Sequence, residues 1–178
     1  IGAFVEDVCE GFVKLAEKES IDFIIQNSSS QQTIWADADA LEKILVNLLS
    51  NAFKYTPANK AIRVSVSVDN DFATIKIEDQ GRGISKEKMA RLFKRFESFN
   101  EDESKPSTGI GLSIVKELMD KHSAKIFVES EPNVGTSFSL FFHTGTSHFK
   151  SDVTIEESGE IKRLKTHDKL VEISAEPD

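Results

Sequence analysis

The stretch Asn-Leu-Leu-Ser-Asn-Ala-Phe-Lys-Tyr, from Asn47 to Tyr55, is the strongest guide to the fold of this chain. In an α-helix of about 3.6 residues per turn, its polar residues stand at i, i+4, i+7 and i+8 and form one stripe. The stripe consists of Asn47, Asn51, Lys54 and Tyr55. The other faces are apolar and would dock the helix onto a core. They carry Ile44, Leu45, Leu48, Leu49 and Ala52.

The side chains of this stripe suit a magnesium nucleotide. Two amide oxygens can hold a hard divalent cation, an ammonium group can meet a phosphate, and a tyrosine ring can cover a flat heterocycle. Taken alone, the stripe fits equally well an ordinary helix with satisfied amides, because short motifs match by chance. The neighbouring segments favour the nucleotide site.

Composition limits the function classes. A chain of 178 residues, 39% hydrophobic and 29% charged, suits one soluble globular domain with a sizeable core. The net charge of -8 argues against a nucleic-acid partner, because phosphate backbones are bound by clustered Lys and Arg. Cys9 is the only cysteine, which excludes an internal disulfide and favours a reducing compartment.

Membrane and targeting segments are not evident in the sequence. No apolar run approaches the roughly 20 residues that span a bilayer, and no signal-peptide pattern opens the chain. Because the sequence begins with Ile1 rather than Met, we expect a fragment of a longer protein, in which a membrane segment could lie elsewhere.

Hydrophobic periodicity predicts an α+β fold. Helical spacing covers residues 4–19, 37–56, 85–93 and 112–122, with Asp37 or Asp39 as the cap of the second helix and Ser85 as the cap of the third. Strand patterns cover residues 21–26, 62–68, 73–77, 125–130 and 136–142, with a short strand at 33–36. We expect a two-layer α/β sandwich, in which a mixed sheet of about five strands carries helices on one face.

Asp79 follows the predicted strand 73–77 and lies on the same face as Ile77. A carboxylate at the edge of an apolar face is costly unless it is hydrogen-bonded. Gly81 and Gly83 come directly after it and would let the backbone approach a ligand closely. An acidic residue in an ordinary turn is the plain alternative. The functional interpretation is an acceptor for an exocyclic amino group.

A polar segment without periodicity, residues 97–107, is a candidate mobile loop. It leads into Thr108-Gly109-Ile110-Gly111-Leu112 at the start of a predicted helix, where exposed N–H groups favour bound phosphate. Charges dominate residues 150–178, which we interpret as a linker or tail.

Together these segments resemble the catalytic, ATP-binding domain of sensor histidine kinases, within the superfamily of gyrase, heat-shock-90 and mismatch-repair ATPases. The resemblance covers about residues 21–142. Residues 47–55 match the asparagine box, 79–83 the first glycine box, 108–112 the second, and Gly135-Thr136 a small box near the end, while Phe93 and Phe96 match the phenylalanine box. The implied architecture is a Bergerat-type ATP-binding fold. Residues 21–149 would be the kinase domain, and residues 1–20 the end of a dimerisation helix or a connector.

The resemblance implies ATP and Mg²⁺ as ligands. Asn51, with Asn47 beside it, would coordinate Mg²⁺, and Lys54 would neutralise phosphate charge, which makes Asn47 and Lys54 the implied catalytic residues. Tyr55 would stack on adenine, and Asp79 would accept its amino hydrogen. Residues 97–108 would form the ATP lid, anchored by the phenylalanine box. The other implied ATP-binding residues are Gly81, Gly83, Ile84, Thr108, Gly109, Ile110, Gly111, Leu112 and Thr136.

Departures from the family pattern refine this expectation. The directly hydrolysing ATPases usually carry a glutamate as general base where this chain has Asn47, which cannot take a proton, so transfer is favoured over hydrolysis. Ser107 stands where the second glycine box usually opens with Gly. Glu97 and Ser98 stand where relatives often have an aromatic residue and Arg. The charge at the γ-phosphate could come instead from Arg95, Lys94 or Lys105.

Members of this family phosphorylate a histidine on a preceding two-helix dimerisation segment, followed by an acidic residue and a nearby Pro. None of the four histidines, His122, His143, His148 and His167, has this full context. The implied partners are therefore a helical dimerisation and phosphoacceptor domain of the same protein and a response-regulator receiver domain, into which the charged tail could lead. The implied setting is the cytoplasmic part of a membrane-anchored sensor. The alternatives are a serine kinase of the anti-sigma type and a non-catalytic, nucleotide-responsive interaction module.

Overall fold

The computed structural model describes residues 1–29, 34–69, 71–95 and 109–145. Its helices are α1 (Gly2–Glu10), α2 (Val13–Glu19), α3 (Ala38–Tyr55), α4 (Lys86–Met89) and α5 (Gly111–Lys121). Its strands are β1 (Asp22–Asn27), β2 (Ala61–Val68), β3 (Phe72–Asp79), β4 (Lys125–Glu131) and β5 (Gly135–His143). The predicted lid, residues 97–108, and the predicted tail, residues 150–178, lie outside the described residues.

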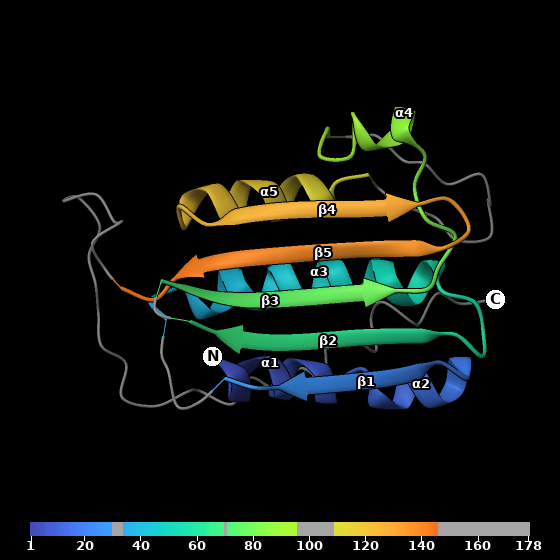
Figure 1. Ribbon diagram of the computed structural model, residues 1–178, viewed down its shortest axis with the longest axis horizontal. Coiled ribbons are helices and arrows are strands. Elements are labelled where there is room, and N and C mark those ends of the chain that lie inside the picture. Colours follow the sequence, from blue (N-terminus) through green and yellow to red (C-terminus); the bar gives the residue numbers. More distant parts are fainter. Residues whose placement is uncertain (30–33, 70, 96–108, 146–178) are drawn as a thin grey trace.

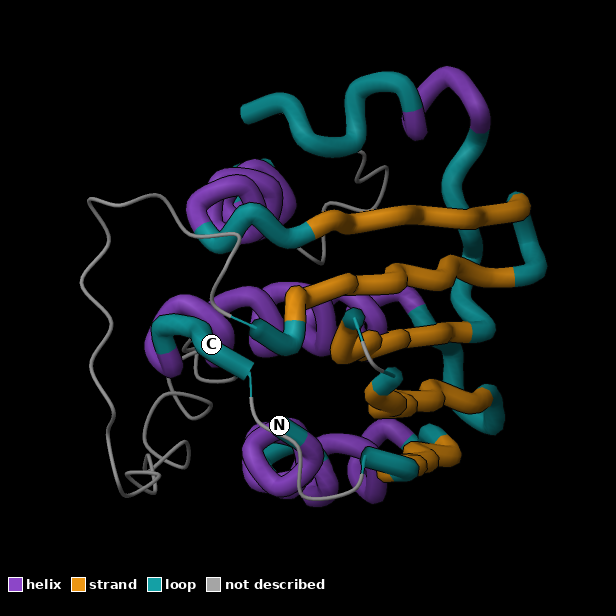
Figure 2. The backbone as a smooth tube through the Cα atoms, turned by 60° about the vertical axis from the view of Figure 1, so that its left-hand side comes forward, coloured by secondary structure: helices purple, strands orange, loops and turns teal. Residues whose placement is uncertain are grey.

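The strands form one mixed sheet in the order β1-β2-β3-β5-β4. β1 pairs with β2 in parallel, and the other neighbours are antiparallel. Figure 1 looks onto the sheet, with α1, α2, α3 and α5 behind it, and Figure 2 shows these helices on one side of the strands. The α+β class, the mixed five-stranded sheet and the two-layer arrangement are therefore confirmed.

α3 is the central helix of the helical layer. The carboxylate of Asp37 accepts a hydrogen bond from the Ala40 N–H at 3.1 Å, which assigns the cap to Asp37 rather than Asp39. The helix ends at Tyr55, two residues before Pro57, which cannot continue a helix. The boundaries predicted from the sequence thus hold to within a residue.

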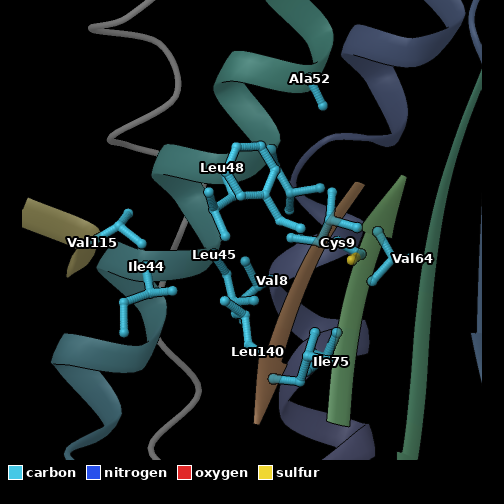
Figure 3. Close-up of a cluster of buried hydrophobic side chains, with 14 of the residues drawn as sticks. Val8, Cys9, Ile44, Leu45, Leu48, Ala52, Val64, Ile75, Val115 and Leu140 are labelled. Atoms are coloured by element: carbon cyan, nitrogen blue, oxygen red, sulfur yellow. The ribbon is translucent and has the colours of Figure 1, made fainter. Parts of the chain in front are cut away.

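The core lies between the helical layer and the inner face of the sheet. Figure 3 shows Leu45 and Leu48 of α3 facing side chains from the strands and from α1. The strand residues Val64, Ile75 and Leu140 are fully buried. Each such side chain contributes about 1.5–3 kcal/mol relative to an exposed one, so the inward stripe of α3 stabilises the fold strongly.

The prediction of one helix over residues 4–19 was wrong. The chain forms two helices separated by a turn at Gly11 and Phe12, and Gly is a poor residue in a helix interior. The break turns the Phe12 ring into the core, where it is 0% exposed and stacks on Phe53 with the ring centroids 5.4 Å apart. Burial of a large aromatic side chain thus outweighs helical continuity.

Two other predictions need correction. Residues 34–36 carry no strand, because this segment leads into the cap of α3 instead of pairing with the sheet. The predicted helix 85–93 shortens to α4, which Ser85 caps as expected, and the chain then continues in turns to Arg95. α4 itself has no buried residue, and Leu92, which is buried in the core, lies in the turns after it.

Candidate nucleotide site

A cavity of about 340 Å³ opens between the second half of α3, the loop after β3 and the start of α5. This volume lies within the range of small-molecule sites. Nine residues predicted from the sequence line it: Asn51, Tyr55, Asp79, Gly83, Ile84, Gly109, Gly111, Leu112 and Thr136. Asn47, Lys54, Gly81 and Ile110 do not line it, and Thr108 lies outside the described residues.

Asp79 is the half-buried carboxylate that lines this cavity. The strand register places it opposite Ile62 of β2 and Thr136 of β5. Its Oδ1 accepts the Gly81 N–H at 2.8 Å, and the Thr136 N–H also bonds to the carboxylate. Burial nevertheless raises the pKa of Asp79 above its ordinary value, outweighing these two donors. The cavity therefore presents an acceptor that is held in place by backbone.

The loop after β3 is shaped by close backbone contacts. Gly83 has a φ of +65°, and a Cβ there would lie 2.0 Å from the carbonyl oxygen of Glu131. The hydroxyl of Ser130 accepts the Ile84 N–H at 2.9 Å and lies 3.0 Å from the Thr136 hydroxyl. This network fixes Ile84 and Thr136, two of the predicted ATP-binding residues, against each other.

The asparagine stripe meets the start of α5 at the other end of the cavity. Asn51 lines the cavity, whereas the Asn47 amide donates to the Lys43 carbonyl oxygen at 2.7 Å. The Asn47 Oδ1 faces Gly111, where an added Cβ would lie only 2.6 Å away. Gly111 thus lets α5 bring its first N–H groups, which lack helical partners, beside the asparagine box.

Tyr55 carries two cations near its ring. The Arg82 guanidinium carbon lies 4.2 Å from the ring centroid, and the Lys54 ammonium lies 5.6 Å from it. Sequence reasoning did not select Arg82, although it stands between the two glycines of the box after β3. Tertiary contact brings further unpredicted residues to the cavity: Ser85, Lys88, Leu92, Pro132, Asn133 and Phe138.

The described histidines have structural surroundings. His122 is buried, its Nε2 accepts the Asp37 N–H at 3.0 Å, and its Nδ1 lies 2.7 Å from the Leu118 carbonyl oxygen. The ring of His143 lies 4.7 Å from that of Phe72. Since both nitrogens of His122 are engaged, this side chain supports the fold and is poorly placed as a phosphate acceptor.

Two negative findings concern only the residues that the structure describes. No group of three or more His, Cys, Asp and Glu side chains gathers there to hold a metal ion. No helix in the same ranges is long and apolar enough to cross a membrane.

Residues 36–146 match the family described as histidine kinase-, DNA gyrase B- and HSP90-like ATPases. This match covers most of the chain and includes the cavity, and the chain therefore belongs to this ATPase family. ATP is the ligand that this membership implies for the cavity.

Individual proteins similar to this chain include sensor and histidine kinases. The chain is 32% identical over 146 residues to the sensor protein EvgS of Escherichia coli strain K12, covering 79% of this chain and 12% of EvgS. It resembles ShkA, solved full-length in complex with AMPPNP, with a TM-score of 0.71 and 27% identity over 83% of this chain and 31% of ShkA. The catalytic domain of the histidine kinase ThkA has the same fold, with a TM-score of 0.71 and 24% identity over 80% of this chain and 92% of that domain.

Proposed function

We propose that this chain is the catalytic domain of a sensor histidine kinase, which binds Mg-ATP and transfers the γ-phosphoryl group to a histidine on a separate segment of the same protein. One observation carries the proposal: the cavity joins a half-buried carboxylate, Asp79, to the amide stripe of α3 and the glycine start of α5. The family match and the sensor kinases among the relatives support it.

Recognition of adenine is assigned to the Asp79 end of the cavity. The carboxylate would accept the exocyclic amino hydrogen, and its two backbone donors keep it from turning away. Tyr55 and Ile84 line the same cavity and supply apolar surface for the base. The triphosphate would then extend toward Asn51 and the start of α5.

Magnesium is assigned to the amide oxygens of α3. Asn51 lines the cavity, and the Asn47 oxygen faces Gly111 beside it, so neutral oxygen ligands of the kind Mg²⁺ accepts stand where phosphates would arrive. When bound, the ion would neutralise phosphate charge. Lys54 is proposed to add positive charge from the same helix.

Transfer is favoured over hydrolysis because Asn47 cannot act as a general base for water. The acceptor imidazole would attack the γ-phosphorus in line, the bond to the bridging oxygen would break, and ADP would leave. The chain contributes positioning and charge stabilisation to this step rather than covalent chemistry.

The proposal of further domains rests on how little of each relative this chain covers. The chain spans 12% of EvgS and 30% of the sensor histidine kinase RppB of Synechocystis, so most of each relative lies outside the matched region. We propose that the complete protein includes a dimerisation and phosphoacceptor domain, that it acts on a response-regulator receiver domain, and that it is a membrane-anchored sensor with this domain in the cytoplasm. Residues 1–20 are proposed to connect to the dimerisation helix.

The test joins this chain to its native upstream segment and supplies radiolabelled γ-phosphate ATP with Mg²⁺. The expected product is an acid-labile, base-stable phosphate on histidine, lost in Asn51→Ala. Asn27→Ala makes the same chemical change on β1, away from the cavity, and should leave labelling intact. Acid-stable phosphoserine on a bound protein, or nucleotide binding without transfer, would overturn the histidine kinase assignment.

A further inference from the structure

Arg82 is an exposed residue that lines the cavity, and both its side chain and its backbone contact neighbouring elements. Its guanidinium lies over the Tyr55 ring, with 4.2 Å between Cζ and the ring centroid. Its N–H donates to the Tyr55 carbonyl oxygen at 3.3 Å, and its own carbonyl oxygen accepts the Asn133 N–H at 2.8 Å. Arg82 thus links the end of α3 to the turn between β4 and β5.

The backbone contacts fix where the guanidinium can reach. Gly81 precedes Arg82, and a Cβ at Gly81 would lie 2.6 Å from the Tyr55 carbonyl oxygen. This close approach brings the chain beside the last turn of α3 and puts the Arg82 side chain within stacking distance of the ring. A planar guanidinium stacks on an aromatic face through both its charge and its flat surface.

Tyr55 needs such a constraint because of its position. It is the last residue of α3, so no following helical turn packs against its ring, and the ring is only half-buried. A ring that moved freely would lose rotamer freedom on ligand binding, which lowers affinity. A stacked guanidinium limits that freedom before the ligand arrives.

We propose that Arg82 is a positioning residue for the nucleotide, acting through Tyr55: its guanidinium holds the ring at the cavity wall in the orientation that receives the ligand. The ligand part of this inference rests on the proposed ATP function, whereas the contact itself belongs to the nucleotide-free protein. Arg82 acts on the ring and is not assigned a bond to the nucleotide.

The contact can be observed directly because Tyr55 is the only tyrosine in the chain. Protein labelled with ¹³C-tyrosine has one set of ring signals in NMR. In the nucleotide-free protein, Arg82→Met should shift these signals and speed ring motion, since the methionine keeps apolar length but removes the planar charge. Arg82→Lys should give an intermediate shift, because it restores the charge without the planar stack.

The effect on binding is measured by calorimetry with Mg-AMPPNP. Arg82→Met should raise the Kd about two- to five-fold, the range expected for a stacked cation at an exposed site, and Arg82→Lys should recover part of the loss. Arg63→Met removes an exposed arginine from β2, outside the cavity lining, and should bind as the parent does. In a Tyr55→Leu background, Arg82→Met should have no further effect, because its action passes through the ring.

Three results would overturn the proposal. The first is unchanged ring signals and affinity in Arg82→Met. The second is a loss of affinity in the Tyr55→Leu background as large as in the parent, which would make Arg82 a direct ligand contact. The third is the absence of nucleotide binding by the parent protein, which would also remove the proposed function. In that case, the Tyr55 ring signals of the nucleotide-free protein would still show whether Arg82 contacts the ring.

Discussion

Asp79 is the residue on which base recognition depends most directly. Its carboxylate is half-buried at the end of β3 and held by the Gly81 and Thr136 N–H groups. Asp79→Asn should raise the Kd for an ATP analogue about tenfold or more, because a hydrogen bond to a charged acceptor contributes about 1.5–3 kcal/mol. Calorimetry measures this change. Glu78→Gln, one residue away and paired with Lys76 at 2.7 Å, should leave affinity unchanged, and equal losses in both variants would contradict the assignment.

The raised pKa of Asp79 also predicts a pH dependence of stability. Between its ordinary value of 3.8 and the raised pKa, the folded state binds more protons than the unfolded state. The contribution of the Asp79 carboxyl group to the free energy of unfolding is therefore present in full below pH 3.8 and lost as the pH rises through the raised pKa. The asparagine of the Asp79→Asn variant does not titrate. The free energy of unfolding of the variant should therefore rise relative to that of the parent as the pH increases through this interval. Above the raised pKa, the difference between the two proteins should stay constant. Urea unfolding over a pH series checks this, and a constant difference would refute it.

At the scale of single elements, α3 depends on its cap because it carries both the core stripe and the asparagine stripe. Asp37→Ala should lower the free energy of unfolding by about 1 kcal/mol, since the Ala40 N–H loses its acceptor. Chemical denaturation measures the loss. Asp39→Ala removes a carboxylate from the first turn without removing the cap, and its effect should be smaller. Equal effects would mean that the side-chain bond of Asp37 adds nothing.

At the scale of the whole molecule, α1 and α2 share the core of the ATP-binding fold. Phe12 is 0% exposed and stacks on Phe53 of α3. Phe12→Ala should lower the free energy of unfolding by about 3–5 kcal/mol, as expected for a large core side chain. Val13→Ala is the control, because Val13 is 40% exposed and should change stability little. A loss below about 1 kcal/mol for Phe12→Ala would mean that the first helices unfold separately from the sheet.

Much of the fold follows from local patterns in the sequence. Alternation in β2 and β3 and the 3.6-residue spacing of α3 are short-range properties. Each pattern puts the apolar residues on one face in only one of the two conformations, strand or helix. The asparagine stripe, Asp79 and the glycines could therefore be selected from residue types and spacing. Gly11 was a local signal for the break after α1, whereas the contact of the Phe12 ring with Phe53, 41 positions further along the chain, could not be read from local spacing.

The amino-acid sequence alone determined α3, the five strands of the sheet, the two layers and the residue types available for a nucleotide. The tertiary structure decided which of these meet: the register of β3 and β5 sets Asp79 beside Thr136, and the start of α5 lies against Asn47, whose Oδ1 would be 2.6 Å from a Cβ at Gly111. Tertiary structure likewise places the Arg82 guanidinium over the Tyr55 ring and brings Asn133 to the cavity. Periodicity records which face of an element is buried, whereas a site is defined by distances between elements, and these are set by packing and strand pairing across the whole chain.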